Sequence, residues 1–303
     1  MPKYAAIDIG TNAIKFHLAE KKSDGTWSAI LDQSEVTRLG AGLHQTGKIS
    51  EAAVERNIKS IKKIVQIARD NGAKDIVAVG TMALRTAKNA SDFIKQVAEQ
   101  CGIKIEIIDG EEEARLSFLA VTSSISIPKS DFMIFDIGGG STEFILCQGK
   151  NIKNKVSLNI GVVRLTEQIL KSDPVTEEEF DLTIQTIEQT FNAINLNNKI
   201  ETLIGVGATM TILGAMKLQL GDYQAEIIHG SQLELSDVMR LVSLLKSKTI
   251  QDRKKIIGLL PDRADVILPG AMIVVVIMKK TGMNVVTISD RGVRQGLLLD
   301  RFR

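Results

Sequence analysis

Cysteine is scarce in this sequence, with only Cys101 and Cys147 among 303 residues. The two residues are far apart in the chain and show neither the spacing of metal ligands nor that of a redox pair. A free cysteine behaves mostly as a small buried apolar residue. We therefore expect two reduced, buried thiols in a cytoplasmic protein.

The sequence also lacks an excess of either charge, because it contains 38 Lys and Arg residues and 36 Asp and Glu residues, for a net charge of +2. Proteins that wrap nucleic acid carry a broad positive field. This composition gives no reason to expect a nucleic acid polymer as a partner. Any polyanion has to be bound by a local group of residues.

No hydrophobic run is long enough to span a bilayer. The best candidate, residues 267–278, contains Pro269 and Gly270 and falls short of the roughly 20 residues that a spanning helix needs. The apolar run at residues 4–7 is too short for a signal peptide. We expect residues 267–278 to form a core helix, and we expect no membrane partner.

A low-complexity linker is absent as well, although 303 residues exceed what one hydrophobic core usually supports. The best boundary is the stretch 123–130, which contains Pro128. We predict an N-terminal domain over residues 1–124, completed by a C-terminal helix at 291–303, and a second domain over residues 125–290.

The order of elements occurs twice. Apolar runs and helical periodicity predict βββαβαβα in the first half, including a helix that Ser50 caps and Gly72 ends. A new series begins at the apolar run 132–135. The period is half the chain, so we predict an α/β protein with a duplicated domain rather than a solenoid.

The duplication places Asp8-Ile9-Gly10-Thr11-Asn12 on residues 136–142, Asp-Ile-Gly-Gly-Gly-Ser-Thr. Glycine permits a tight turn whose backbone N–H groups converge on a phosphate oxygen. A carboxylate beside a phosphate requires a cation between them, which implies Mg²⁺ or another divalent cation. One such motif is equally well a simple hairpin turn. Two copies at matched positions favour a phosphate site.

These residues give a specific resemblance that covers nearly the whole chain. The sequence resembles the Ppx/GppA family of exopolyphosphatases and guanosine pentaphosphate phosphohydrolases, in the superfamily of actin, sugar kinases and heat-shock chaperones. The resemblance implies two ribonuclease H-like (actin-like ATPase) domains with an inter-domain cleft. It rests on both loops and on five further motifs: Gly80-Thr81, Leu84-Arg85, residues 110–115 (Gly-Glu-Glu-Glu-Ala-Arg), Arg263-Ala264-Asp265, and Ser289-Asp290 with Arg294 and Gly296.

The resemblance also implies roles for individual residues. The catalytic set is Glu113 as the base that activates water, Arg85 and Glu143; the phosphate-binding set is Gly10, Thr11, Asn12, Gly138, Gly139, Gly140 and Ser141; the metal ligands are Asp8, Asp136 and Glu143. The residues alone leave alternatives open. Acids after Gly110 also favour a helix N-terminus, Arg85 can be a surface cation, and Glu143 a solvent-facing strand residue.

The implied function is Mg²⁺-dependent, processive hydrolysis of terminal phosphate from inorganic polyphosphate, with release of orthophosphate. The alternative is 5′-phosphohydrolysis of guanosine pentaphosphate (pppGpp) at the same centre. The departure at Met210-Thr211, where the family usually has Gly-Thr, argues against binding of a guanosine base.

An actin-like ATP-dependent interaction module and a sugar or acetate kinase are less favoured. A homodimer is a possible assembly.

Overall fold

A computed structural model describes residues 1–194 and 200–302. The chain forms two compact units. Unit 1 comprises Met1–Ala120 with Val293–Arg303, and unit 2 comprises Val121–Gly292. The chain therefore passes between the units twice, at positions 120/121 and 292/293. Arg303, the last residue of the expected C-terminal helix, lies outside the described residues.

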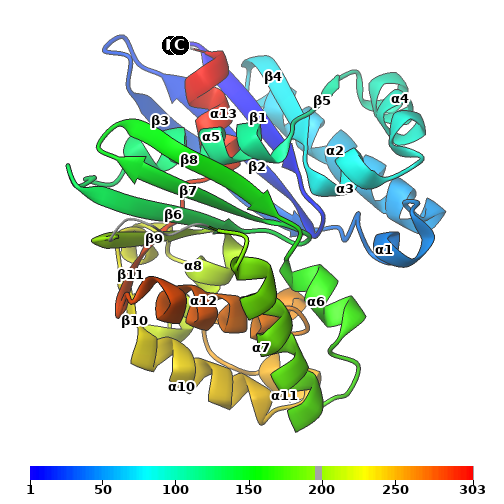
Figure 1. Cartoon of the computed structure of the whole chain (residues 1–303). Coiled ribbons are helices and arrows are strands. Elements are labelled where there is room, and N and C mark those ends of the chain that lie inside the picture. Colours follow the sequence, from blue (N-terminus) through cyan, green and yellow to red (C-terminus); the bar gives the residue numbers. More distant parts are fainter. Residues whose placement is uncertain (195–199, 303) are drawn as a thin grey trace. The chain divides into compact units, whose positions relative to one another are not determined.

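Unit 1 is built on one mixed sheet. Its strands are β1 (Lys3–Ile9), β2 (Ala13–Lys21), β3 (Trp27–Val36), β4 (Ala73–Gly80) and β5 (Ile105–Ile107), in the order β3-β2-β1-β4-β5 (Figure 1). The first three strands are antiparallel, whereas β4 and β5 run parallel to β1. The loops after β1, β4 and β5 therefore leave from the same edge of the sheet.

The helices of unit 1 are α1 (Leu43–Thr46), α2 (Glu51–Asp70), α3 (Met82–Thr86), α4 (Ala90–Cys101), α5 (Gly110–Thr122) and α13 (Val293–Arg301). The Ser50 side chain accepts a hydrogen bond from Ala53 N and begins α2, as predicted. Ile58, Ile61 and Val65 on one face of α2 are buried in the core of unit 1. The two short helices α1 and α3 carry too little periodicity to be predicted.

The C-terminal helix α13 packs against β1, β2 and β4 of unit 1. A polar cluster fixes its start: Arg294 Nε donates to Asp32 Oδ1 at 2.7 Å, and Gln295 Nε2 donates to Asp32 Oδ2 at 2.8 Å. His17 Nδ1 lies 3.1 Å from the same Oδ2 atom, although its alignment falls short of a hydrogen bond. Asp32 is thus the anchor of α13 on the sheet.

Asp32 should make the stability of the protein depend on pH in acid. Burial alone would raise the pKa of its carboxyl group, but the neighbouring His17 and Arg294 outweigh burial and lower the pKa from 3.8 to about 2. The native state then binds fewer protons than the unfolded chain between these values. Asp32 therefore contributes about 2 kcal/mol to the free energy of unfolding above pH 3.8, and this contribution is lost as pH falls through about 2.

Urea unfolding of the wild type and Asp32→Asn between about pH 6 and about pH 2 measures this contribution. The difference between their free energies of unfolding should shrink toward low pH, because the variant lacks the titrating carboxylate. A difference that stays constant over this range would contradict the assignment.

Unit 2 repeats the sheet of unit 1 and adds a strand. Its strands are β6 (Asp131–Ile137), β7 (Thr142–Gln148), β8 (Asn151–Leu158), β9 (Thr202–Val206), β10 (Gln232–Glu234) and β11 (Val285–Ser289), in the order β10-β11-β9-β6-β7-β8. Beginning from β8, this order matches that of unit 1, with β11 in the place of β5. Strands β6, β9 and β11 are parallel, so their carboxyl ends share one edge.

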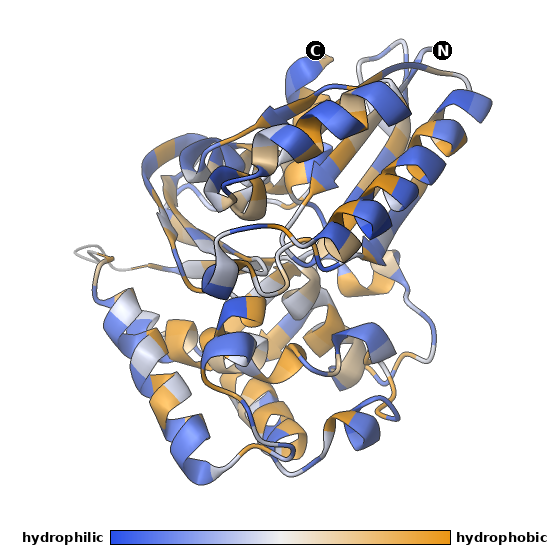
Figure 2. Cartoon of the chain, turned by 90° about the vertical axis from the view of Figure 1, so that its right-hand side faces the viewer, coloured by the Kyte–Doolittle hydropathy of each residue, from blue (hydrophilic) through white to orange (hydrophobic). Residues whose placement is uncertain are grey.

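The helices of unit 2 are α6 (Val162–Gln168), α7 (Glu177–Phe191), α8 (Ala208–Lys217), α9 (Ala225–Ile228), α10 (Leu235–Lys246), α11 (Ile250–Arg253) and α12 (Ile267–Thr281), with a 3₁₀ turn at Pro261–Arg263. Residues 267–278 of α12 are all buried, so the prediction of a core helix is confirmed. Hydrophobic residues gather on the inner sides of the helices and along the strands of each unit (Figure 2). Over the described residues, no helix is long and apolar enough to cross a membrane.

Candidate active site

The loop after β1 in unit 1 is closed by its own backbone. Gly10 N donates to Ala13 O at 3.0 Å. The carbonyl of Thr11 accepts from Gly40 N, and the carbonyl of Asn12 accepts from Thr37 N and Arg38 N. The protein therefore holds the N–H group of Gly10 and the carbonyl groups of Thr11 and Asn12, so that the N–H groups of Thr11 and Asn12 are the donors suited to a ligand.

Asp8 lies at the base of this loop and is 2% exposed. Its Oδ2 atom is 3.2 Å from Lys15 Nζ, on the neighbouring strand position of β2. Its Oδ1 atom and Asn12 Nδ2 are both buried without a hydrogen-bond partner. Buried polar atoms rarely remain unsatisfied in a native protein, so these two atoms are suited to bind a ligand.

The loop after β6 in unit 2 has the same construction. Gly138 N donates to Ser141 O at 2.9 Å, and the first amides of α6, Val162 N and Val163 N, donate to the carbonyls of Gly138 and Gly139. A Cβ atom added to Gly10 or Gly138 would lie 3.0 Å from the closing carbonyl oxygen in each case. The two loops are thus the same device built twice, with glycine required at the same point.

Asp136, at the base of the second loop, is 6% exposed and pairs across the sheet with Glu143, which is 1% exposed. Glu143 Oε1 accepts a hydrogen bond from Ser157 Oγ at 2.7 Å. Like charges directly opposite each other on a sheet repel. A cation between or beside these carboxylates would offset that repulsion.

Segments from the neighbouring strands enclose Asp136. Gly207, which follows β9 and has φ 98°, lies so close that an added Cβ would be 2.9 Å from Asp136 Oδ1. Gly292, after β11, comes next to Val206 and to Asp136 Oδ2. At Gly207 only a residue without a side chain fits, because an added Cβ would also lie 2.8 Å from the carbonyl oxygen of Ile137. The backbone at Gly207 and Gly292 thus forms a wall around the carboxylate.

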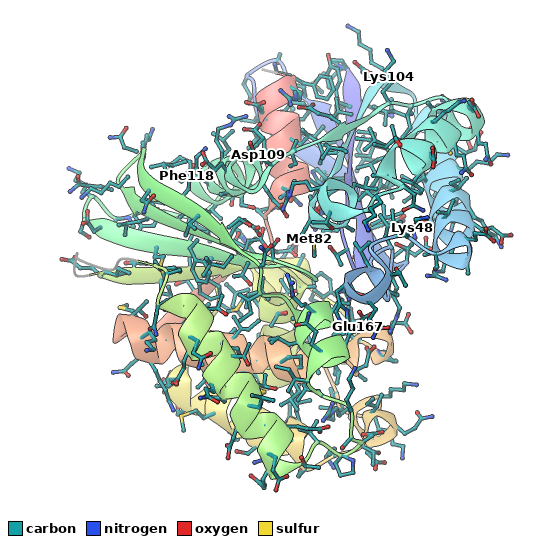
Figure 3. The ribbon with its side chains drawn as sticks, turned by 45° about the vertical axis from the view of Figure 1, so that its right-hand side comes forward. Lys48, Met82, Lys104, Asp109, Phe118 and Glu167 are labelled. Carbon is teal, nitrogen blue, oxygen red and sulfur yellow. The ribbon has the colours of Figure 1, made fainter. Side chains whose placement is uncertain are left out.

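Arg85 and Glu113 lie at the carboxyl edge of the sheet in unit 1. Thr81 N donates to Ile9 O at 3.3 Å and Ile108 N donates to Gly80 O at 3.1 Å, which joins the ends of β1, β4 and β5. Met82 and Asp109, labelled in Figure 3, mark where α3 and α5 begin beyond these ends. The loop of Asp8 therefore shares this edge with both helices.

Arg85 Nη1 is 3.0 Å from Glu113 Oε2 and also donates to Ile108 O at 2.8 Å. The Glu113 residue is 9% exposed, and the Arg85 side chain is 20% exposed. A charge-assisted hydrogen bond of this kind fixes the carboxylate in position. Arg85 is thus neither an isolated surface cation nor distant from the predicted base.

The three acids at the start of α5 have different partners. Asp109 Oδ1 accepts from Glu112 N at 2.8 Å and so caps the helix. Glu111 is exposed, whereas Glu112 forms two hydrogen bonds of 2.7 Å with Arg115, which also bonds Asp300 of α13. Glu112 therefore holds α5 to α13, and Glu113 is the acid directed to Arg85.

The structure groups the predicted residues into two sets. Unit 1 brings together Asp8, the loop Gly10–Asn12, Arg85 and Glu113 at one edge of its sheet; unit 2 brings together Asp136, the loop Gly138–Ser141 and Glu143 at the matching edge. That both sets flank one cleft stays a prediction. Sequence reasoning missed Lys15, although it follows Asp8 by seven residues as Glu143 follows Asp136, and this equal spacing was the available signal.

The residues fit a divalent cation. Within the described residues, no three His, Cys, Asp or Glu side chains form a metal-binding cluster. Mg²⁺ does not require one, because it is commonly held by one or two carboxylates with water and phosphate oxygens. The unpartnered Asp8 Oδ1 and the Asp136–Glu143 pair supply donors of this kind.

The side chain of Met210, in α8 after β9, does not reach the surface of the protein. The Met210 side chain is fully buried and packs beneath Gly205, where an added Cβ would lie 2.7 Å from its terminal carbon. The prediction that Met210-Thr211 argues against binding of a guanosine base therefore finds no support in the position of this side chain.

Comparison with known proteins gives a consistent result. The chain is 33% identical to the bifunctional 3-dehydroquinate synthase/phosphatase of Fusobacterium nucleatum, over 98% of this chain and 46% of the relative. It is 29% identical to exopolyphosphatase 2 of Mycobacterium tuberculosis, over 99% of this chain and 98% of the relative. It is also 29% identical to the guanosine-5′-triphosphate,3′-diphosphate pyrophosphatase of Photobacterium profundum, over 99% of this chain and 59% of the relative. The chain thus spans about half the length of the first and third of these relatives.

Among solved structures, an exopolyphosphatase from Cytophaga hutchinsonii superposes with a TM-score of 0.92 at 27% identity and covers 99% of both chains. The predicted α/β fold of two actin-like domains is confirmed. The sequence model of the Ppx/GppA phosphatase family matches residues 18–303. The chain therefore belongs to the Ppx/GppA phosphatase family, whose members hydrolyse phosphoanhydride bonds.

Proposed function

We propose that the protein is an exopolyphosphatase that removes terminal phosphates processively from inorganic polyphosphate in a reaction that depends on Mg²⁺. The observation that carries this proposal is the doubled loop, closed by the same hydrogen bond and bearing a buried aspartate at its base in both units. A polyphosphate chain presents at every unit the phosphate oxygens that a loop of this kind binds. The solved exopolyphosphatase with a TM-score of 0.92 supports the choice of substrate.

Gly10 and Gly138 close the two turns with their own N–H groups. The N–H groups of residues 11–12 and 139–141 bind phosphate oxygens, and Arg85 adds a planar fork of donors. Asp8, Asp136 and Glu143 would hold a divalent cation, which would neutralise the charge of the phosphate oxygens. Arg85 is placed to stabilise the negative charge that grows on the oxygens of the terminal phosphate.

Glu113 acts as the general base. Water attacks the terminal phosphorus as Glu113 accepts its proton, and the bond from that phosphorus to the bridging oxygen breaks. The shortened polyphosphate keeps the electron pair of the broken bond on its new terminal oxygen. The products are orthophosphate and a chain that is one phosphate shorter.

The alternative substrate is pppGpp. The same residues would remove its 5′-terminal phosphate, because the two substrates differ only beyond the leaving group. The relative named a guanosine-5′-triphosphate,3′-diphosphate pyrophosphatase supports this alternative.

Cys101 and Cys147 are both free and buried, and burial raises the pKa of both thiols, which fits a reducing compartment such as the cytoplasm.

Phosphate release measured side by side from long polyphosphate, pppGpp and ATP tests the proposal. We expect the highest kcat/KM for polyphosphate with Mg²⁺ present and a loss of activity on chelation, restored by added Mg²⁺. A preference for pppGpp would select the alternative. Preferred hydrolysis of ATP would favour an actin-like module, and full activity in chelator would remove the metal from the proposal.

A further inference from the structure

His229 binds both segments through which the chain enters and leaves unit 2. It lies at the end of α9, where Asp290 N donates to its Nδ1 atom at 3.2 Å. Its Nε2 atom is 3.4 Å from the carbonyl oxygen of Ser124. Asp290 is two residues before the end of unit 2, and Ser124 is three residues after its start.

These two contacts determine the protonation state of the ring. A backbone N–H can only donate, so Nδ1 must carry a lone pair and the imidazole is neutral with its proton on Nε2. The Nε2–H group then donates to the Ser124 carbonyl. Histidine suits this position because one ring supplies an acceptor and a donor on opposite sides.

The segment that His229 holds lies beside the Asp136 site. Gly292, two residues after Asp290, forms part of the wall at Asp136 Oδ2. Tyr223 Oη donates to Asp290 Oδ1, and Ser289 Oγ exchanges hydrogen bonds with the backbone of Arg291. The wall is therefore held by side chains from three places in unit 2, and the His229 side chain also reaches the segment after α5.

We infer that His229 is a positioning residue that fixes the wall of the Asp136 site to the segment following α5, and that it does so only while its ring is neutral. For catalysis this inference rests on the proposed function, because Glu113 lies on α5. Protonation would convert Nδ1 from an acceptor into a donor, so that two N–H groups would face each other and the contact with Asp290 N would break. The site would then lose the constraint on residues 289–292 as pH falls.

The surroundings of the ring favour the neutral form. Burial lowers the pKa of His229 below its ordinary value of 6.5, the Ser124 carbonyl acts in the opposite direction, the charge of Arg291 lowers the pKa further, and Asp290 raises it. The segment at Ser124 presents a carbonyl to the ring, and Tyr223 meets Asp290 rather than His229. The contact should thus persist at neutral pH and be lost only as pH falls through the lowered pKa of His229.

Three variants of the full-length protein separate the two contacts. His229→Asn keeps an acceptor near Nδ1 but cannot reach Ser124; His229→Gln keeps a donor near Nε2 but leaves Asp290 N–H without its acceptor; His229→Ala loses both. His44→Ala, on exposed α1, is the matched control. Hydrogen exchange of the Asp290 amide should quicken at least about tenfold in the Gln and Ala variants and stay near wild type in the Asn and control variants.

Turnover with polyphosphate supplies the second measurement. We expect His229→Ala to lower kcat roughly tenfold, with partial recovery in His229→Asn, because a displaced wall misaligns the site. Wild-type kcat should fall as pH drops through the lowered pKa of His229, and His229→Asn should lack that inflection. A structural role alone would not give this pH profile.

Unchanged exchange of the Asp290 amide in His229→Ala would overturn the inference, and so would faster exchange with wild-type turnover. If the wild type releases phosphate from none of the substrates, the proposed function fails. The exchange measurement needs no substrate and still decides whether His229 fixes the wall.

Discussion

Glu113→Gln is expected to lower the rate of phosphate release by roughly 10²- to 10⁴-fold. Glutamine keeps the size of the side chain and an oxygen that can accept from Arg85 Nη1, now 3.0 Å from Glu113 Oε2. It cannot take the proton of the attacking water. Substrate affinity should change little, because the loops and Arg85 remain.

The stability of this variant should fall by at most about 1 kcal/mol, since the Arg85 hydrogen bond loses its charge but retains its geometry. A helix-terminal role for Glu113 would give a similar loss. Stability therefore cannot separate the two roles, and turnover measured on the same sample can.

The neighbouring acids are matched controls. Glu111→Gln removes an exposed charge and should leave both turnover and stability close to wild type. Glu112→Gln weakens the pair with Arg115 and should lower stability while keeping most of the turnover. A fully active Glu113→Gln enzyme would show that another carboxylate, with Glu143 the next to test, accepts the proton.

Sequence periodicity was sufficient for the duplicated sheet because each strand ends in a turn that glycine or aspartate marks. The helix that Ser50 begins and the buried helix at Ile267–Thr281 also have strong local signals. The added strand β10 and the short helices α9 and α11 span three or four residues each. Elements of this length take their structure from packing rather than from a periodic pattern.

The partners of the site residues depend on contacts that are distant in sequence. Arg294 and Gln295 bond Asp32, more than 260 residues away, and nothing local to either segment indicates this. The register across β1 and β2 is different, because it follows from the turn. Counting seven residues from each loop aspartate finds Lys15 in one half and Glu143 in the other.

Because of this difference, the two loops share one backbone arrangement but have different charges opposite their aspartates. Asp8 has a lysine opposite, which offsets its charge, whereas Asp136 has a second carboxylate opposite. We therefore propose the loop of unit 2 as the better candidate for a divalent cation. The sequence analysis assigned the same role to both aspartates because it named Glu143 in the second half but not Lys15 at the equivalent position in the first half.

Gly296→Ala is expected to destabilise the protein by about 3 kcal/mol or more, at the upper end of the cost of overpacking. Gly296 of α13 lies against the backbone of α5, and an added Cβ would be 2.6 Å from the carbonyl carbon of Leu116. Main-chain atoms cannot rotate away as a side chain does. One of the helices must shift, against the Asp32 cluster and the bond between Arg115 and Asp300.

The shift should also affect turnover, because Leu116 is three residues from Glu113 on the same helix. We expect kcat to fall in the fraction that remains folded, and urea unfolding together with phosphate release measures both effects. Gly221→Ala is the matched control, since no atom lies within 4 Å of its added Cβ, and its stability should stay within about 1 kcal/mol of wild type. Wild-type stability in Gly296→Ala would mean that α5 and α13 do not approach as closely as described, and the support of Glu113 by α13 would have to be abandoned.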